Sequence, residues 1–321
     1  MRARRLPGVD FKEVATLRFM LIFAVPNSAS SHEWVRLQPN GAWVVMAKMR
    51  CISIFTVVLM VVWTGAPVGA AATAVDLELV LAVDVSGSID KEEAELQRRG
   101  YIDALSDPSV VQAVSSGRHG RIALAYVEWA GLDYYRVVVG WREIADLDGA
   151  RAFAREIALS PLFTAQRTSI SNAIVFSIPM FDNNGFDGTR RVIDISGDGP
   201  NNYGPLVTVA RDQAIARGIT INGLPIMNDR PNPWGFPTTE DLDLYYANCV
   251  IGGPGAFLVV AESFRSFAGA IRTKLVREIA GGVPANDMPR GLLVPAAGHA
   301  GPPCDVGEKQ WDNFIRDRNQ F

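Results

Sequence analysis

The sequence predicts a doubly wound α/β fold: a mostly parallel six-stranded sheet with one antiparallel edge strand and helices on both faces. Two observations carry this prediction. From about residue 75 to residue 279, apolar runs of strand length alternate with longer segments of helical period. Several of the runs are almost continuous in Val, Ile, Leu and Ala, which is typical of parallel strands covered on both faces. With 321 residues, 48% of them hydrophobic, the chain is long enough for one sizeable core.

Six segments are expected to form the strands of this sheet. In chain order they are Leu77–Asp84, Arg121–Trp129, Tyr134–Val139, Val192–Ser196, Ile219–Ile226 and Ala256–Val260. A short turn at Gly131 separates the second segment from the third, so we expect a hairpin with the third strand antiparallel at the edge. We expect the strand order 3-2-1-4-5-6, which places the first and fourth strands side by side.

The segments between the strands have helical periodicity. The expected helices are Lys91–Leu105, Ile144–Leu159, Ser169–Met180, Pro205–Arg217, a short one at Thr239–Asn248, and Glu262–Ile279. Asp107 and Pro108 are expected to end the first helix before a Ser/Gly-rich loop. In the last helix the apolar residues follow helical spacing, which indicates a face packed on the core.

An oxygen-rich loop follows the first strand directly. Asp84, Ser86 and Ser88 form the pattern D-x-S-x-S, and Asp90 is expected to cap the next helix. Open α/β sheets bind their ligands at the carboxyl ends of central strands. One carboxylate and two hydroxyls suit a hard divalent cation, Mg²⁺, Mn²⁺ or Ca²⁺, with water completing the shell. The alternative is an ordinary Ser/Asp-rich turn that only caps the helix.

Two later stretches complete a three-part motif. Thr168 stands at the start of a later helix, and Asp198 follows the fourth strand in the segment RRVIDISGDG. The combination resembles the metal-ion-dependent adhesion site of the von Willebrand factor A (VWA) family. The wording AVDVSGSI, SGDGPNN and CVIGGPGAF resembles secreted bacterial VWA-like proteins of unknown function most closely. The third loop reads S-G-D-G where the family more often has T-D-G. The resemblance covers about residues 76 to 283 and implies a metal site formed by Asp84, Ser86, Ser88, Thr168 and Asp198.

The chain is expected to have four parts. They are residues 1–48, 49–70, 71–283 and 284–321. We interpret residues 1–48 as a non-native or disordered extension, with translation starting at Met46 or Met49. Residues 49–70 are expected to be a signal peptide, because basic residues precede a 12-residue apolar run, Ile52–Trp63, and small residues follow it. The alternative is a cytoplasmic leader on an uncleaved anchor. Residues 71–283 are the VWA-like domain, and we expect a secreted or periplasmic protein with no stable membrane span after cleavage.

The cysteines agree with export. Cys51 lies within the signal region, which leaves Cys249 and Cys304 as a pair in an oxidising compartment. We predict a disulfide between them, the alternative being two unrelated thiols. After Gly282 the composition shifts to Pro, Gly and Ala, so the Pro/Gly-rich tail is expected to be an extended strap held at Cys304.

Charge excludes one class of partner. The chain has 31 basic and 34 acidic residues, and residues 71–321 hold 23 basic and 31 acidic ones, a net charge of about −8. An acidic domain is poorly suited to nucleic acid, so no nucleic-acid partner is expected.

Three function classes are compatible with this fold. The first is a binding module whose cation is engaged by an acidic residue of a protein partner, as the VWA resemblance implies. The second is a hydrolase in which the same cation activates water. The third, a nucleotide-binding protein, lacks G-x-G-x-x-G after the first strand. The signatures H-E-x-x-H, G-x-S-x-G and G-x-x-x-x-G-K-S/T are also absent from residues 71–321, so we expect the binding module and no enzyme.

Several further polar or aromatic residues have two interpretations. Glu128 and Asp194 interrupt apolar strands, and each is either a residue that orients a metal-bound water or a carboxylate that meets solvent or an Arg. Asn201 and Asn202 either contact the metal's waters or form an ordinary turn. Trp234 and Phe236 either form an exposed binding anchor or pack over the core.

Overall fold

The computed structural model describes residues 71–131, 133–227, 236–281 and 301–318. The predictions for the extension and the signal peptide, for Trp234 and for residues 284–300 of the tail lie outside these ranges. No helix in the described ranges has both the length and the apolar character needed to cross a membrane.

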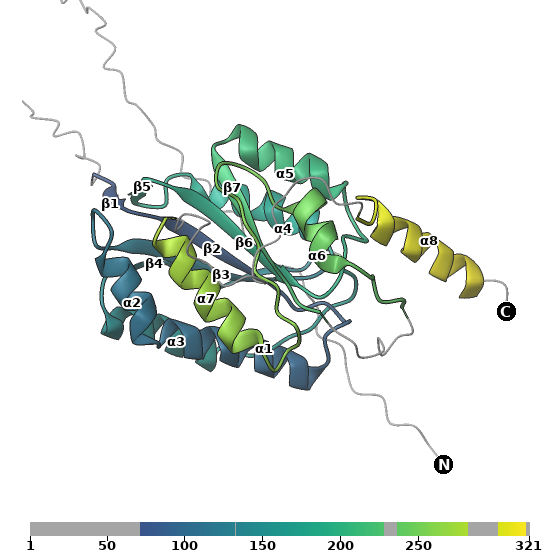
Figure 1. Cartoon of the computed structure of the whole chain (residues 1–321), viewed down its shortest axis with the longest axis horizontal. Helices are drawn as coiled ribbons and strands as arrows, with labels where there is room; N and C mark the ends of the chain where they lie inside the picture. Colours follow the sequence, from purple (N-terminus) through teal and green to yellow (C-terminus); the bar gives the residue numbers. More distant parts are fainter. Residues whose placement is uncertain (1–70, 132, 228–235, 282–300, 319–321) are drawn as a thin grey trace, which may run out of the picture. The chain divides into compact units, whose positions relative to one another are not determined.

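A five-stranded sheet forms the centre of the fold, in the order β4-β3-β2-β6-β7 (Figure 1). Its strands are β2 (Glu78–Asp84), β3 (Ile122–Trp129), β4 (Tyr135–Ile144), β6 (Arg191–Gly197) and β7 (Ile219–Pro225). The pair β3–β4 is antiparallel, and the other three pairs are parallel. The predicted fold class and the predicted order of the first five strands are confirmed.

The predicted sixth strand lies beside β7 but is joined to it only by isolated bridges. Gly223 pairs with Leu258 and Ile226 with Ala261, both in parallel. The ladder is interrupted at Pro225, which has no N–H to donate between these two pairs. The segment therefore occupies the expected place in the sheet without forming a continuous strand.

Helices cover both faces of the sheet. They are α1 (Lys91–Leu105), α2 (Pro108–Ser115), α3 (Leu147–Leu159), α4 (Ile170–Ser177), α5 (Val207–Ala216), α6 (Leu242–Tyr245), α7 (Phe267–Ile279) and α8 (Val306–Arg318). Figure 1 shows α1, α2, α3 and α7 on one face and α4 and α5 on the other. Each face has its own apolar cluster: Leu79 and Leu81 point to the first, whereas Val80 and Ala82 point to the second. The alternation of side chains along one strand thus feeds two cores.

Some helix boundaries differ from the predicted ones. Asp107 does not end the helical region, because its side chain caps a new helix, α2, whose first residue is Pro108. Strand β4 continues to Ile144, so α3 begins only at Leu147. Helix α7 begins at Phe267, five residues after the predicted start, and α4 passes into a short 3-10 helix, Ile178–Phe181.

A second, two-stranded parallel sheet was not predicted. Its strands are β1 (Thr73–Val75) and β5 (Phe186–Gly188). Each strand has three residues, which is too short for a hydrophobic pattern to reveal.

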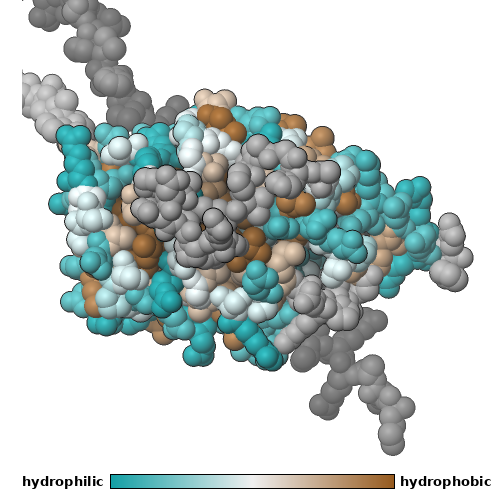
Figure 2. Space-filling view, viewed as in Figure 1, coloured by the Kyte–Doolittle hydropathy of each residue, from teal (hydrophilic) through white to brown (hydrophobic). Residues whose placement is uncertain are grey.

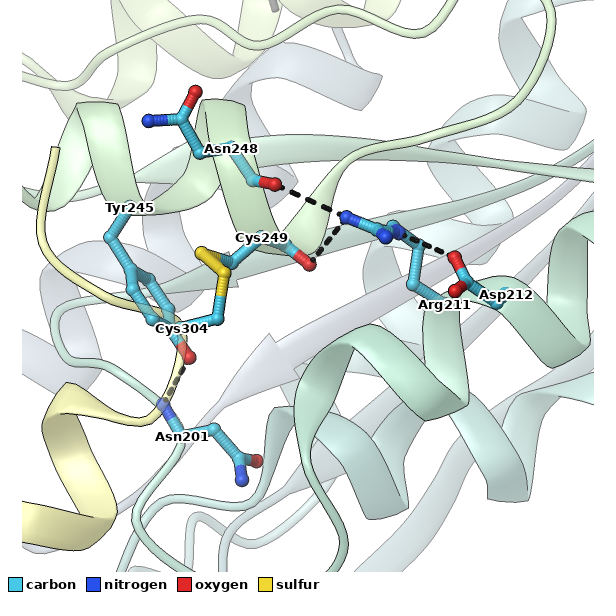
Figure 3. Close-up of a disulfide and its surroundings, with 7 residues drawn as sticks. All are labelled: Asn201, Arg211, Asp212, Tyr245, Asn248, Cys249 and Cys304. Carbon is cyan, nitrogen blue, oxygen red and sulfur yellow. Dashed lines mark hydrogen bonds and ion pairs between the residues drawn. A yellow bond between two sulfur atoms is a disulfide. The ribbon is translucent and has the colours of Figure 1, made fainter. Parts of the chain in front are cut away.

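The tail prediction is partly wrong. Residues 306–318 are not an extended strap but the helix α8, which carries apolar residues near Trp311 and charged residues elsewhere. The predicted disulfide is present: Cys249, in a π-helical turn after α6, is bonded to Cys304 just before α8, with a Cα–Cα distance of 5.4 Å (Figure 3). The Pro/Gly-rich composition between α7 and Cys304 hid the helix that follows it.

The two carboxylates that interrupt apolar strands are both paired with cations. Glu128 in β3 is an ion-pair partner of Arg98 and lies 3.7 Å from Nη1 of Arg136. Asp194 in β6 is fully buried, and its Oδ1 lies 2.6 Å from Nζ of Lys274. These contacts favour the ion-pair interpretation over a role in orienting a metal-bound water.

Lys274 joins α7 to the centre of the sheet. Its Nζ pairs with Asp194 and with Glu278, and all three side chains are fully enclosed. Asn222 donates from Nδ2 to Oε1 of Glu278 at 3.0 Å. Burial, and then the charge of Asp194, raise the pKa of Glu278 to about 7.

Lys274→Met should destabilise the protein by about 3 to 5 kcal/mol, because it leaves two buried carboxylates without their cation. Urea denaturation at pH 7 measures this. The control is Arg272→Met on the same helix, whose ion pair with Asp107 is exposed and contributes at most about 1 kcal/mol. Equal losses in the two variants would show that the buried cluster has no special role in holding α7.

Candidate functional site

The candidate site lies where β2 and β6 end, next to the start of α4. Asp84 is the last residue of β2, and Asp198 follows the last residue of β6. The chain passes from β2 to α1 on one face of the sheet and from β6 to α5 on the other, so the site sits at the topological switch point.

Hydrogen bonds connect the five residues that the sequence singled out. Oδ1 of Asp84 accepts from the backbone N–H of Ser86 at 2.7 Å. The hydroxyls of Ser86 and Ser88 are 2.9 Å apart, and Oγ of Ser88 donates to Oδ1 of Asp198 at 2.6 Å. Oγ1 of Thr168 donates to Oγ of Ser86 at 3.4 Å. The structure thus brings together Asp84, Ser86, Ser88, Thr168 and Asp198, which come from three separate parts of the chain.

The five residues form a gradient from the core to the surface. Asp84 is 0% exposed and Ser86 1%, whereas Ser88 and Asp198 are partly exposed. Burial, together with the charge of Asp198, raises the pKa of Asp84 well above its usual range. The site therefore has the carboxyl group of Asp84 at its buried base and the oxygens of Ser88 and Asp198 at its partly exposed mouth.

One oxygen at the base of the site lacks a protein partner. Oδ2 of Asp84 is buried and accepts no hydrogen bond from any residue that the structure describes. The buried hydroxyl of Tyr246, in the turn after α6, likewise makes no hydrogen bond within the described residues. A buried carboxylate oxygen without a hydrogen bond is costly, so this atom is suited to a cation.

Gly197 keeps space open beside that oxygen. A Cβ built on Gly197 would lie 2.8 Å from Oδ2 of Asp84 and 3.0 Å from the hydroxyl of Tyr246. This explains the S-G-D-G wording of the third loop: a side chain at position 197 would collide with the base of the site.

Asn201 and Asn202 hold the third loop against the start of α4. Oδ1 of Asn202 accepts from the backbone N–H of Thr168 at 2.9 Å, and Oδ1 of Asn201 accepts from that of Ser171, also at 2.9 Å. The backbone N–H of Asn202 donates to the carbonyl of Thr168 at 2.9 Å. The two asparagines therefore position Thr168 relative to Asp198, a role that neither interpretation from the sequence included.

Arg167 is a functional candidate that the sequence did not reveal. It has a left-handed backbone, with φ of 66°. Its guanidinium donates to the backbone carbonyl of Asn202 and lies 3.8 Å from the ring centre of Trp311 and 5.0 Å from that of Tyr203. A positive charge is thus held directly beside the site.

The donor set fits a hard divalent cation. It consists of two carboxylates and three hydroxyls, all oxygen ligands of the kind that Mg²⁺, Mn²⁺ and Ca²⁺ take. The described residues contain no group of three or more His, Cys, Asp or Glu side chains that could hold a metal ion. The fit therefore depends on the hydroxyls and on the oxygen of Asp84 that has no protein partner.

The sequence comparisons identify a family whose function is unknown. The family model described as "Protein of unknown function (DUF1194)" matches residues 74–283, well over half of the chain. The chain belongs to this family. No curated protein matches it. The matched range agrees with the 76–283 that the sequence motifs indicated.

A solved von Willebrand factor type A protein and two other solved structures are similar to part of this chain. A von Willebrand factor type A protein from Catenulispora acidiphila is 14% identical, with a TM-score of 0.44, over 64% of this chain and 43% of that one. The pilus adhesin SpaC from Lactobacillus rhamnosus GG, in its open conformation, is 14% identical, with a TM-score of 0.48, over 65% and 31%. Proximal thread matrix protein 1 from the mussel byssus, with its MIDAS motif occupied by zinc, is 13% identical, with a TM-score of 0.46, over 66% and 50%. The chain spans half or less of the length of these three proteins. Each of the three TM-scores is below 0.5, and no function follows from these matches.

Gly197→Ala should destabilise the protein by about 1 to 3 kcal/mol, because the added methyl group overpacks the space between Asp84 and Tyr246. Chemical denaturation checks this. Gly140→Ala on the edge strand is the matched control, since no described atom lies within 4 Å of its added Cβ. An unchanged stability in the Gly197 variant would contradict the steric role assigned to this glycine.

Proposed function

We propose that this protein is an exported binding module that holds one divalent cation and uses it to engage an acidic side chain of a protein partner. The residues that would hold the cation are Asp84, Ser86, Ser88, Thr168 and Asp198. We favour Mg²⁺, with Mn²⁺ or Ca²⁺ as alternatives. The observation that carries the proposal is the buried Oδ2 of Asp84, which receives no hydrogen bond from the described residues although the other oxygen of the same carboxyl group accepts from Ser86.

The charges at the site explain why an acidic ligand would be preferred. Two carboxylates balance the charge of a divalent cation, so the loaded site is close to neutral within an acidic domain. When bound, the cation supplies positive charge and coordination positions filled by water that a carboxylate can take. Arg167 adds a fixed positive charge beside the mouth of the site. Acidic surfaces that the domain as a whole would repel are therefore attracted at this one end of the sheet.

Export is part of the proposal. It is supported by the predicted signal peptide at residues 49–70 and by the disulfide between Cys249 and Cys304, since such bonds persist in oxidising compartments. A secreted or periplasmic location follows from the same two features.

Hydrolysis is the alternative that the same residues allow. His119 is the one histidine in the described ranges, and its backbone N–H donates to Asp76 just before β2, at the opposite end of the sheet from the site. Within the part of the chain that the structure describes, none of the site hydroxyls contacts a histidine, which a nucleophile activated by a base would require. These contacts argue against a hydroxyl nucleophile activated by His119, and hydrolysis by cation-activated water is separated from binding by the experiments below.

Asp84→Asn should weaken Mg²⁺ binding by at least about 100-fold. Losing even an outer partner of a metal ligand costs about 10- to 100-fold, and Asp84 would contribute a ligand charge itself. Calorimetric titration with Mg²⁺ measures the loss. The control is Asp146→Asn, which alters a helix-capping carboxylate near the other end of the sheet and should leave the affinity unchanged. Parent-like affinity in the Asp84 variant would refute the assignment of the site.

Capture of an acidic side chain should require the cation. In the presence of Mg²⁺, acetyl-Gly-Glu-Gly-amide should shift backbone amide signals near Ser88 and Asp198 in NMR spectra. The matched peptide with Gln in place of Glu should not, and excess chelator should abolish the effect.

Thr168→Ala should weaken this capture about tenfold or more while costing the fold only about 1 kcal/mol, because a single hydroxyl near a helix start is lost. Thr273→Ala, which removes an exposed hydroxyl from α7, is the control. Glu-peptide shifts that persist undiminished in chelator would exclude a metal-bridged ligand, and hydrolysis of a phosphoester by the loaded protein would favour the alternative.

A further inference from the structure

A cavity of about 160 Å³ adjoins the candidate metal site and has α8 as one wall. We propose that this cavity binds a ligand in which a carboxylate is joined to an apolar group about the size of a benzene ring. The inference rests on the proposed function, because it places the ligand's carboxylate at the cation and assigns the rest of the ligand to the cavity.

Part of the cavity lining is aromatic. Phe236 packs against Trp311 and Phe314 of α8, with ring centres 5.8 Å apart in each pair. The Trp311 and Phe314 rings are themselves 5.8 Å apart. Three aromatic side chains around one space provide an apolar surface with defined geometry. The sequence left two interpretations of Phe236, an exposed binding anchor or a residue packed over the core. In the structure, Phe236 forms part of the lining of this cavity.

Another part of the lining belongs to the mouth of the metal site. Ser88, Thr168 and Asp198 line the cavity, together with Gly87 and Gly199. Because the two glycines have no side chains, a ligand can approach the oxygens of the site closely. The cavity therefore has both an apolar and a polar part to its lining.

Two arginines give the cavity a positive side. Arg167 and Arg318 both line it. Arg167 is fixed by its contacts with Trp311 and with the carbonyl of Asn202, whereas Arg318 lies over the ring of Phe314 at 5.3 Å. Guanidinium groups in the lining of a cavity favour a carboxylate on the bound molecule.

The size of the cavity limits the apolar group. An apolar cavity of about 150 Å³ in a protein core accommodates one benzene molecule. At about 160 Å³, this cavity matches one ring or a branched aliphatic group of similar volume.

Helix α8 is docked firmly enough to serve as a wall. Gly307 packs so closely on the third loop that a Cβ there would lie 2.1 Å from the carbonyl oxygen of Asn201. Glu308 accepts a hydrogen bond from Nδ2 of Asn201 at 2.8 Å, and Thr239 donates to Gln310 at 3.1 Å. Figure 3 shows the disulfide to Cys304 just ahead of this helix, close to Asn201.

The side chains of α8 that line the cavity argue against a role of α8 as an internal inhibitor that occupies the metal site. They are Trp311, Phe314 and Arg318, with no carboxylate among them. A helix that blocked the site by imitating the partner would present an acidic side chain to it. The charged residues of α8 instead lie mostly on its exposed side, where Figure 2 shows a hydrophilic surface at the right of the view. The wall thus complements an acidic ligand and does not replace one.

The test is a calorimetric titration of the magnesium-loaded protein with three probes. They are 3-phenylpropionate, acetate, which lacks the ring, and 3-phenylpropan-1-ol, which lacks the carboxylate. We expect 3-phenylpropionate to bind at least tenfold more tightly than either of the others. Trp311→Ala and Phe314→Ala should each reduce this advantage at least fivefold, whereas Ile315→Ala, on the same helix but outside the cavity lining, should preserve it. Circular dichroism checks that each variant is folded.

A fourth probe, acetyl-Phe-Glu-amide, identifies the source of the ligand chemistry. Binding comparable to that of 3-phenylpropionate assigns the cavity to a peptide with an aromatic residue beside its acidic one. A tenfold preference for the free acid assigns it to a small molecule.

Two results would overturn the inference. The first is equal affinity for acetate and 3-phenylpropionate. The second is tighter acetate binding in Trp311→Ala, which would show that α8 obstructs access to the site and does not contribute to binding. Magnesium binding is measured separately for each variant: protein that takes up no Mg²⁺ contradicts the proposed function, whereas protein that takes up Mg²⁺ without preferring the ring contradicts this inference alone.

Discussion

The parallel pairing of β2 with β6 is the constraint on which the site depends. Its register sets Val83 opposite Ser196, so Asp84 lies beside Gly197 and close to the loop that carries Asp198. A slip of one residue would turn Asp84 to the other face of the sheet, because side chains alternate along a strand. The apolar residues on both faces of β2 fix this register, and the register sets the direction of the Asp84 side chain. The register between β2 and β6 thus determines both which side chains pack in the two cores and where Asp84 lies in the candidate site.

The sequence predicted the order of the five strands in the central sheet and the five residues of the candidate site, because both leave strong local patterns. Buried parallel strands read as continuous apolar runs, and D-x-S-x-S followed by a later Thr and Asp is specific as a combination, although each part alone is weak. The missed features depend on contacts between distant segments. Nothing in the sequence near Asn201 shows that its amide faces Ser171, and nothing near Arg167 shows that Trp311 lies over it. Helix α8 follows a long Pro/Gly-rich segment, so the composition of the tail concealed it.

Two buried aspartates in neighbouring strands, Asp194 and Asp84, have different surroundings. On the face covered by α1 and α7, Asp194 is neutralised by Lys274 within the core. At the carboxyl end, Asp84 is equally buried, but no cationic side chain of the described residues pairs with it. The same residue type in neighbouring strands thus has two different environments. One stabilises the docking of a helix, and the other leaves a carboxyl oxygen without a protein partner, which suits a ligand from outside.

The disulfide between Cys249 and Cys304 has a consequence for the integrity of the chain. The two cysteines are 55 positions apart, and the peptide between them includes α7. A protease that cut the backbone between α7 and Cys304 would separate two stretches of polypeptide without releasing α8 from the domain. The helix beside the cavity is therefore attached twice, once by the main chain and once by sulfur. Proteolytic nicking and detachment of this helix are separate events, and the second requires a reductant as well.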